Sequence, residues 1–282
     1  MSYQLVEQLH KKAVPVGRLC RVLGVSRSGY YGCRQRAKLA PKACLVSTQL
    51  KAEFAASGKV YGSRRLSAVL CAQGLRTGRH RVRRLMREHG LCALWRRKFV
   101  HTTDSGHALP VSANVLARRF NPSGRVSDIT YIRTRSGWLY LAVVLDLYAR
   151  KVVGWSMSER ITEKVAIDAM EQAVGREGSP DDGSLVFHDD QGAQYTSRSF
   201  QRCLDSHGIV QSVSRPGTPL DNAVAESFFK TLKRELVKER SYGTRDEAKQ
   251  DIFKYIELYY NRVRMHSTLG YMSPVEYERQ YA

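Results

Sequence analysis

The sequence FHDDQGAQYTS (187–197) opens a stretch that continues through DNAVAESFFKTLKRE (221–235) to residue 240. Thirty-five residues separate Asp190 from Glu226 in this stretch, and a third acidic residue, Asp128, lies upstream in VSDITYIRT (126–134). Hard divalent cations such as Mg²⁺ prefer oxygen ligands, and a set of three carboxylates needs neither histidine nor cysteine. The three residues therefore predict a site for divalent metal.

Two expected strands set the positions of the aspartates. An apolar strand over residues 185–188 ends just before Asp190 and the turn residue Gly192, and ligands collect at the carboxyl ends of strands in open α/β sheets. Asp128 lies in an alternating strand over residues 126–133. This strand opens a predicted meander, in which Gly137 makes the first turn and further strands follow over 138–146 and 151–157.

One expected helix delivers the glutamate. Asp221 is a favourable N-cap, and a stripe of apolar residues at helical spacing runs from it to about residue 240. Glu226 lies one turn inside this helix. Lys230 and Lys233 follow at i+4 and i+7 on the same face, where they could meet the phosphate of a substrate.

Two further stretches belong to the same pattern, one before and one after those quoted above. They are SDITYIRTRSGWLYLAVVLDLYARKVVGWSMS (127–158) and YNRVRMHSTLGYMSPVEYE (260–278). Together the four stretches resemble the catalytic core of DDE transposases of the IS-three insertion-sequence family, a core similar to that of retroviral integrase. The resemblance covers essentially the whole chain. By matching position, it implies that Asp128, Asp190 and Glu226 are the catalytic and metal-binding triad.

The resemblance also implies a fold and a reaction. The expected fold is α/β, an RNase H-like catalytic core with a mixed five-stranded sheet flanked by helices, preceded by all-α helix-turn-helix regions. The implied reaction is metal-dependent 3′-end cleavage of DNA and strand transfer at the ends of an insertion sequence, with two Mg²⁺ ions as cofactors and Mn²⁺ as a substitute. Asp128 and Asp190 are expected to act as ligands, and Glu226 to hold the second ion.

Three positions near the triad depart from the family pattern. HDDQGAQY stands where the family usually reads HSDRGSQY, which places Asp189 beside the inferred ligand and Gln191 where a basic residue is common. Spacing and the following Gly192 favour Asp190 as the ligand, because successive side chains of a strand point in opposite directions. Leu220 stands where many relatives have tryptophan.

Positive charge is concentrated in the first part of the chain. Residues 1–120 contain 24 Lys and Arg against 4 Asp and Glu, whereas residues 121–282 contain 22 of each. Such asymmetry favours a polyanionic partner, and nucleic acid is the commonest one. We expect four regions: a helix-turn-helix over 1–45, a second basic helical region over 46–99, a linker over 100–124 and the catalytic core over 125–282.

The first region, 14–36, has the pattern of a helix-turn-helix. Gly24 allows a tight turn, and Ser26 can cap the second helix. The second helix is expected to offer three side chains to a DNA groove: Arg27, Tyr30 and Arg34. An ordinary helical hairpin with solvated arginines is the alternative, and the motif alone does not distinguish the two.

The second region contains another helical pair over residues 61–90. Ser63 is expected to cap its first helix, Gly74 breaks that helix, and Gly90 ends the second one. The exposed side of the second helix is rich in arginine, with Glu88 as a single acidic neighbour, which favours an external phosphate partner. The candidate DNA-binding residues here are Arg79, Arg83, Arg84 and Arg87.

The closing segment contains a predicted helix over residues 245–260, followed by the motif YNRVRMH. Asn261, Arg262, Arg264 and His266 in this motif either dock the helix against the sheet or contact DNA, and both interpretations stay open.

The leading hypothesis is a transposase, and two alternatives come from other classes: a non-catalytic DNA-binding regulator of transposition and an RNase H-type nuclease. The expected partners are double-stranded DNA, as terminal inverted repeats and target, a second copy of the chain in a homo-oligomer, and an upstream-frame product. The six cysteines never form a CxxC pair, which argues against a zinc knuckle or a disulfide framework. No signal peptide or long apolar run favours a membrane, so we expect a bacterial cytoplasmic, nucleoid-associated protein.

Overall fold

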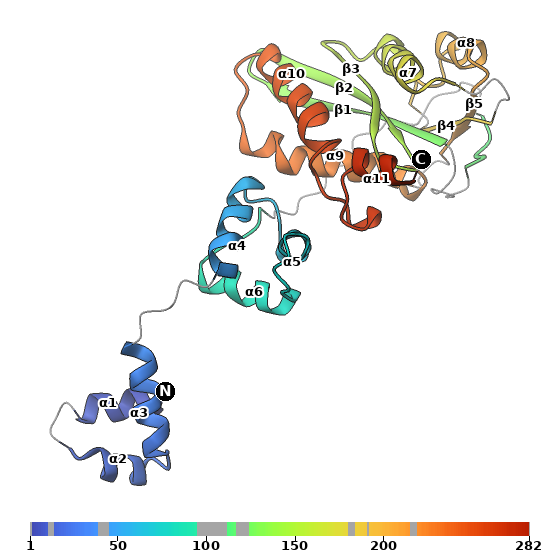
Figure 1. Cartoon of the computed structure of the whole chain (residues 1–282). Coiled ribbons are helices and arrows are strands. Elements are labelled where there is room, and N and C mark those ends of the chain that lie inside the picture. The colour runs from blue at the N-terminus through green and yellow to red at the C-terminus, as the bar shows by residue number, and fades with distance from the viewer. Residues whose placement is uncertain are drawn as a thin grey trace.

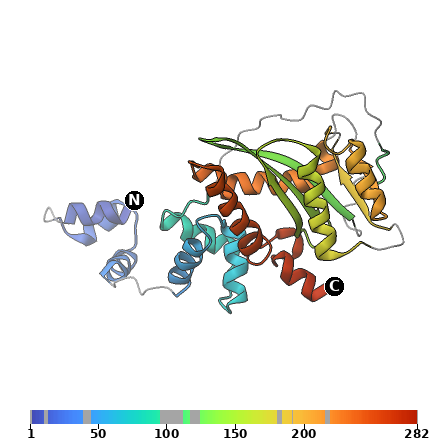
Figure 2. The ribbon, with the colours of Figure 1, turned by 90° about the horizontal axis from the view of Figure 1, so that it is seen from above.

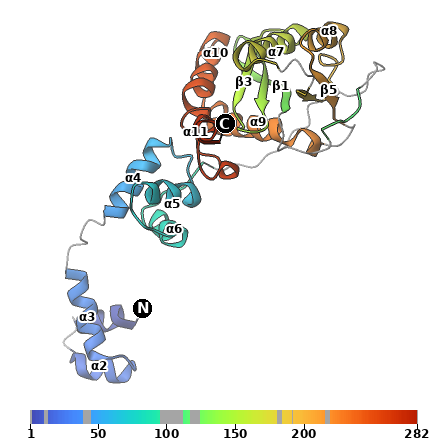
Figure 3. The same ribbon diagram turned by 45° about the vertical axis from the view of Figure 1, so that its right-hand side comes forward.

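The structure is a computed structural model, and it describes residues 2–10, 14–38, 45–94, 112–116, 124–179, 184–190, 192–214 and 219–281. Most of the predicted linker over 100–124 lies outside these ranges. Figures 1 and 3 show two small helical bodies followed by a larger body built on a sheet. None of the helices in the described ranges is long and apolar enough to cross a membrane.

The first helical body contains α1 (Ser2–His10), α2 (Val16–Val22) and α3 (Arg27–Lys38). Its core consists of Val6, Val16, Leu19, Cys20 and Tyr30. Gly24 makes the turn between the last two helices with a φ of 61°. Ser26 caps α3, because its Oγ accepts a hydrogen bond from the Gly29 amide at 3.2 Å. The predicted helix, tight turn and capped helix are confirmed.

The second helical body contains α4 (Leu45–Ala56), α5 (Ser63–Ala72) and α6 (Arg79–Glu88). It buries a core that includes Leu50, Phe54, Leu66, Leu70 and Val82. Gly74 and Gly90 follow α5 and α6 with φ of 81° and 65°, which confirms both as helix ends. The prediction that Ser63 caps α5 is wrong. Gly62 is the N-cap with an extended backbone, and Ser63 is already the first helical residue.

The third body contains a five-stranded sheet in the order β3-β2-β1-β4-β5. Its strands are β1 (Gly124–Thr134), β2 (Gly137–Asp146), β3 (Val152–Ser158), β4 (Val186–Asp189) and β5 (Val210–Val213). The first three strands form an antiparallel meander, and β4 and β5 run parallel to β1. The sheet is therefore mixed, as predicted, and Gly137 makes the first turn with a φ of 119°.

Helices cover both faces of this sheet (Figure 2). α7 (Glu163–Glu177) and α8 (Arg198–Ser206) pack on one face over a core that includes Ala142, Val144, Met170, Phe187 and Phe200. α9 (Ala223–Glu235) and α10 (Arg245–Lys254) pack on the other face over a core that includes Leu141, Val143, Phe228, Leu232 and Ile252. Gly154 permits the close contact of β3 with α7, since an added Cβ would lie 2.1 Å from the Ala169 carbonyl oxygen.

The start of α9 differs from the prediction. A 3₁₀ turn, η1 (Pro219–Asn222), precedes the helix, so Asn222 occupies the N-cap position and Asp221 lies before it. Asp221 is fully buried and accepts a hydrogen bond from Asn114 Nδ2 at 2.9 Å. The prediction that Asp221 caps this helix is therefore wrong. The helix also ends earlier than expected, and a second 3₁₀ turn, η2 (Val237–Glu239), follows it.

The C-terminal elements complete this layer. α10 begins at a capping box formed by Thr244 and Glu247, and it continues as a π-helical segment, η3 (Tyr255–Tyr260), which confirms the helix predicted over 245–260. A short 3₁₀ turn, η4 (Ser267–Leu269), and α11 (Pro274–Tyr281) follow.

Candidate active site

Asp128 lies on β1 at the point where β4 ends its pairing with that strand. β4 pairs with residues 124–126 of β1, and Asp128 is two residues farther along. Its Oδ1 accepts a hydrogen bond from the Ile129 amide at 2.7 Å. Burial raises the pKa of the Asp128 carboxyl well above its usual range, and the charge of Asp190 raises it further.

Asp190 directly follows β4. Its Oδ1 accepts a hydrogen bond from the Gly192 amide at 3.0 Å, and a Cβ at residue 192 would approach this oxygen to 2.9 Å. A side chain at position 192 would therefore crowd the Asp190 carboxylate. The preceding Asp189 is fully buried, and its Oδ2 accepts a hydrogen bond from Gln211 at 3.0 Å. The two aspartates thus point to different surroundings, as the alternation of a strand predicts.

Glu226 lies in the first turn of α9 and is partly exposed. Lys230, one turn farther along, donates a hydrogen bond to its Oε2 at 2.7 Å. The lysine side chain is 59% exposed, so this ion pair is a weak surface interaction that can exchange for another partner.

The three carboxylates come from β1, the end of β4 and the start of α9. Asp190 and Glu226 both act on Asp128, because the charge of each raises its pKa. Among the described residues, however, no three or more His, Cys, Asp or Glu side chains are close enough together to hold an ion. The residues match the donor chemistry of a divalent cation, and completing the coordination would require their side chains to move closer together.

Lys233 lies beside this group. Its Nζ is 5.0 Å from the centre of the Tyr131 ring, which is a cation–π contact. Burial lowers the pKa of the lysine, and the charge of Asp128 opposes this shift. Lys233 therefore places a positive charge within the electric field of the first carboxylate.

Several buried polar residues that the sequence analysis did not identify hold the site in place. Asn222 Nδ2 donates to the Ser127 carbonyl at 3.0 Å and so ties the start of α9 to β1. The Ser127 hydroxyl lies 2.8 Å from the Tyr195 hydroxyl, which ties β1 to the loop after β4. His188 lies between the hydroxyls of Ser212 and Ser214, at 2.9 and 3.0 Å. The only sequence signal for them was their position next to the triad motifs.

Three of the four residues predicted in the closing motif are buried in the docking of the C-terminal helices, whereas Arg262 is exposed and its role stays a prediction. The Asn261 side chain hydrogen-bonds both the amide and the carbonyl of Val152 on β3, at 2.9 Å each. Arg264 is 3% exposed, and its Nε and Nη2 donate to the two carboxylate oxygens of Glu235, at 2.9 Å each. His266 is also buried. These three residues are structural in the described fold.

The second helical body contacts this same region. The Tyr61 hydroxyl accepts a hydrogen bond from the Met265 amide at 3.1 Å, and Arg65 Nη1 lies 4.0 Å from Glu235 Oε1. The guanidinium of Arg65 also lies 5.3 Å from the centre of the Tyr61 ring. Glu235 therefore joins two bodies of the molecule.

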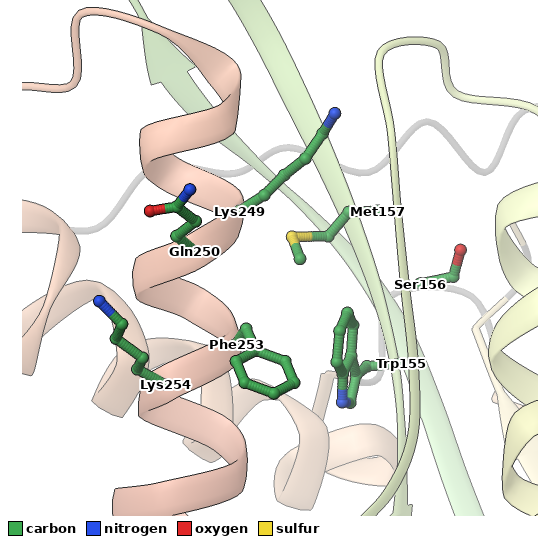
Figure 4. A pocket seen from close by; sticks show the side chains of 7 residues that line it. All are labelled: Trp155, Ser156, Met157, Lys249, Gln250, Phe253 and Lys254. Carbon is green, nitrogen blue, oxygen red and sulfur yellow. The ribbon is translucent and has the colours of Figure 1, made fainter.

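A surface hollow lies at the β3 edge of the sheet (Figure 4). Its walls come from β3 and α10: Trp155, Ser156, Met157, Lys249, Gln250, Phe253 and Lys254. β3 is an edge strand that β2 and β1 separate from β4. None of the three carboxylates lines this hollow, so it is separate from the candidate active site.

Comparison with curated proteins identifies the family of the chain. Transposase InsF for insertion sequence IS3A of Escherichia coli (strain K12) is 39% identical over 99% of this chain and 99% of its own length. The chain belongs to the IS3 family of transposases. The transposase for insertion sequence element IS904 of Lactococcus lactis is 45% identical, over 83% of this transposase and 94% of the relative.

Domain families agree with this assignment. Two integrase core domain families match residues 122–219 and 207–274 of the transposase, and an HTH-like domain family matches residues 44–99. The α/β core is therefore of the integrase type, RNase H-like, with a helix-turn-helix-like region before it. Together with the transposase relatives, this makes the chain a DDE-type polynucleotidyl transferase, an enzyme class whose families are metal-dependent.

Solved structures are more distant from the transposase. A simian T-cell lymphotropic virus intasome in complex with PP2A regulatory subunit B56 gamma aligns with a TM-score of 0.46 and 19% identity, over 74% of this chain and 69% of that one. The catalytic domain of Mos1 mariner transposase aligns with a TM-score of 0.42 and 13% identity, over 49% and 71%. At these values, neither likeness bears on substrate or mechanism.

The structure places the candidate DNA-binding residues of the first helical body in different settings. Arg27 is exposed, and Arg34 is partly exposed with its Nε 3.8 Å from Glu7. Tyr30, in contrast, is 2% exposed, and its hydroxyl donates to Glu7. The expectation that Tyr30 contacts a DNA groove is corrected, because its ring belongs to the core of this body.

The arginines of α6 lie on its exposed side, opposite the buried Val82, Leu85 and Met86. Within this exposed set, Arg84 forms an i,i+4 pair with Glu88 at 3.5 Å. The exposed set contains the four predicted residues Arg79, Arg83, Arg84 and Arg87. Their contact with DNA remains a prediction, and their exposure leaves them accessible for it.

Proposed function

We propose that this transposase cleaves and joins DNA at the ends of its own insertion sequence, with Asp128, Asp190 and Glu226 as catalytic residues and metal ligands. The observation that supports the proposal most directly is the placement of these carboxylates on β1, directly after β4 and in the first turn of α9, where Asp190 and Glu226 both raise the pKa of Asp128. A cation bound among them would neutralise that repulsion.

Two divalent ions, Mg²⁺ or Mn²⁺, fit this oxygen-only set of donors. When bound, they supply activation of the attacking hydroxyl and stabilisation of the leaving oxygen in an in-line displacement. The chain itself orients the ligands: the Gly192 amide fixes the Asp190 carboxylate, and the Ile129 amide fixes that of Asp128. Release of Glu226 from Lys230 would free both side chains, one for the metal and one for a DNA phosphate.

DNA would be held by three basic surfaces. Lys230 and Lys233 lie along α9 beside the carboxylates, where they would bind the phosphates next to the reacting one. The two helical bodies would bind the flanking duplex through the exposed residues Arg27, Arg34, Arg79, Arg83, Arg84 and Arg87. Each phosphate that they neutralise should add about 0.9 to the slope of log affinity against log salt.

The assembly and its setting are part of the proposal. Joining two element ends to one target requires both ends to be held at once, so we expect a homo-oligomer, with an upstream-frame product as a further partner. The regions proposed for these tasks are 1–45 and 46–99 for DNA binding, 100–124 as linker and 125–282 for catalysis. We expect the enzyme to act in the bacterial cytoplasm, at the nucleoid.

The test is strand transfer on a labelled duplex that carries an element end, with Mg²⁺ present. The unaltered protein should give joined product, and Glu226→Gln should give none while it still binds the duplex, because glutamine keeps the shape and loses the charge. Asp205→Asn, an exposed acidic residue on α8, is the matched control and should retain full activity.

Two outcomes would contradict the proposal. Binding without cleavage by the unaltered protein, also after the upstream-frame product is added, would favour a non-catalytic regulator. Preferential cleavage of RNA in an RNA–DNA hybrid would favour an RNase H-type nuclease.

A further inference from the structure

An exposed aromatic group extends the candidate active site along the β1–β2 hairpin. Tyr131 of β1 pairs with Tyr140 of β2, and Arg133 pairs with Trp138, so these side chains share one face of the sheet. Farther along β2, α7 covers this same face. At the hairpin end the face is more open, and Trp138 is 44% exposed.

Tyr131 contacts two neighbours, Trp138 of this group and Lys233 of α9. The rings of Tyr131 and Trp138 meet edge to face, with their centres 5.0 Å apart. On Tyr131, the Lys233 ammonium lies 5.0 Å from the ring centre. We call Tyr131, Trp138 and Lys233 the hairpin platform. It presents an exposed indole beside a positive charge, a combination suited to a flat, electron-rich ring joined to an anion.

The hairpin platform lies close to the catalytic carboxylates. Tyr131 is three residues beyond Asp128 on the same strand, a separation of about 10 Å, and its ring lies on the other face of β1 from the Asp128 carboxylate. Lys233 is two helical turns beyond Glu226 on α9, again about 10 Å. Lys233 connects the two groups, because it contacts Tyr131 and lies on the same helix as Glu226.

Positive charge dominates the surroundings of the hairpin platform. Arg133 and Arg135 are exposed on the hairpin. Arg245 Nε donates to the Trp138 carbonyl at 3.1 Å, and its Nη1 pairs with Glu159 at 3.1 Å. The acidic Glu159 is therefore engaged by Arg245, which leaves a surface complementary to a phosphate backbone.

We propose that the hairpin platform receives an unpaired base of the DNA strand that is bound at the catalytic carboxylates. The base would stack on Trp138, and Lys233 would bind an adjacent phosphate. Bases inside a duplex already stack on their neighbours, so only a frayed or extended end offers a free ring to an indole. This inference rests on the proposed function, and it adds that the enzyme prefers ends whose terminal bases are open.

Binding measurements test the inference without catalysis, and they use the full chain carrying Glu226→Gln. Two DNAs are compared, a blunt element-end duplex and the same duplex with a short unpaired 3′ extension. Trp138→Leu should weaken binding of the extended DNA about tenfold, as loss of one stacked base does, and change binding of the blunt DNA by less than about twofold. Trp138→Phe should restore most of the preference, since phenylalanine keeps an aromatic face.

The matched control is Trp155→Leu, which removes a tryptophan on β3 that lies on the other face of the sheet, against α10 (Figure 4). It should leave the preference for the extended DNA unchanged. The chain has three tryptophans, at positions 95, 138 and 155, so replacing Trp95 and Trp155 by phenylalanine leaves Trp138 as the only one. Its fluorescence should then be quenched by the extended DNA, and much less by the blunt duplex.

The inference is overturned if Trp138→Leu weakens both DNAs equally or neither. It is also overturned if the variant changes the oligomeric state and leaves the DNA preference intact, because the platform would then be an interface between two copies. Failure of the two proposals can be told apart. If the preference for extended DNA depends on Trp138 but no joined product forms, only the proposed catalysis is wrong. If joined product forms but that preference is absent, only the role of the platform is wrong.

Discussion

The two ends of α9 carry two glutamates, Glu226 and Glu235, whose surroundings differ in exposure and in hydrogen bonding. Glu226 at the start is partly exposed and held by an exposed lysine, whereas the side chain of Glu235 at the end is 2% exposed. Glu235 accepts hydrogen bonds from Arg264 and from the Tyr255 hydroxyl, the latter at 2.8 Å. One helix therefore offers one carboxylate for chemistry and uses the other to fix its own position.

The physical difference between the two glutamates is the strength of their partners. An exposed ion pair on a helix contributes about 0.3–0.5 kcal/mol and is easily exchanged. A buried carboxylate that faces a guanidinium through two parallel hydrogen bonds is held firmly, and removal of either partner leaves a buried charge. An exposed carboxylate such as Glu226 can therefore move to bind an ion. A buried carboxylate such as Glu235 instead holds the helix in place, and we call Glu235 with Arg264 the anchor.

The largest effect is expected at the anchored end. Glu235→Gln should destabilise the protein by about 3–5 kcal/mol, because Arg264 would remain buried without a counter-charge. Urea unfolding followed by circular dichroism measures this. Glu257→Gln is the matched control: Glu257 pairs with Arg176 at 2.8 Å but is 20% exposed, so we expect a loss of about 1 kcal/mol or less. Equal losses would remove the distinction between buried and exposed pairs.

The second effect concerns the metal at the other end of the helix. At a Mg²⁺ concentration of about 100 times the dissociation constant, the unaltered protein should gain about 2.7 kcal/mol of stability. EDTA should remove this gain, and Glu226→Gln should lose most of it while unfolding normally without metal. Thermal unfolding with and without Mg²⁺ measures both. The comparison fails if Glu226→Gln retains the full stabilisation by Mg²⁺.

The pH dependence of the free energy of unfolding provides a second test of the region around Arg264. Burial lowers the pKa of His266 to about 3, with the charge of Arg264 adding to the shift. The unfolded chain binds a proton near pH 6.5 and the folded chain does not, so the stability present above pH 6.5 is lost as the pH falls toward 3.

Between pH 7.5 and 5.5, this loss should be about 1 kcal/mol for His266. Urea unfolding at the two pH values measures it. His188 adds a loss of the same sign, because burial lowers its pKa to about 4. His266→Gln should therefore reduce the pH dependence without abolishing it, and His80→Gln, on the exposed side of α6, should leave it unchanged. An undiminished pH dependence in His266→Gln would contradict the assignment.

A smaller loss of stability is expected where the second helical body contacts Glu235. Arg65 is 20% exposed and lies 4.0 Å from a carboxylate that Arg264 already satisfies, so Arg65→Gln should cost about 0.5–1 kcal/mol. Hydrogen exchange should show faster opening around residues 263–265 and little change in the sheet. Arg64→Gln, on the exposed neighbouring position, should have no such effect. Uniform acceleration across the sheet would mean that Arg65 supports the core itself.

The smallest effect is expected for Lys230. Lys230→Gln should change the free energy of unfolding by about 0.5 kcal/mol or less, as for exposed i,i+4 pairs. Stabilisation by Mg²⁺ should persist, since the variant frees Glu226 from its partner. Calorimetry with Mg²⁺ measures this. A loss above 2 kcal/mol, on the scale of about 3–5 kcal/mol for broken buried pairs, would place Lys230 in the scaffold and not at the site.

The sequence predicted much of the local structure correctly. The meander, the turn at Gly137, the cap at Ser26 and the glycines that end α5 and α6 all depend on neighbours in the chain, and all are confirmed. Two predictions were wrong because a residue whose type suits a local role instead makes long-range contacts in the folded protein. Asp221 is a favourable helix cap by type, yet it is buried against Asn114. Tyr30 lies on a helix rich in arginine, yet its ring completes a core.

The sequence by itself determined the order of the carboxylates, the family and the division of charge between the two halves, because spacing and composition are properties of the chain. Only the tertiary structure decided which distant residue each of these side chains contacts. It placed Lys233 over Tyr131, Arg264 on Glu235 and Asn222 on the backbone of Ser127. These contacts join residues that are far apart in sequence, and burial and distance set their strength, which no local pattern records.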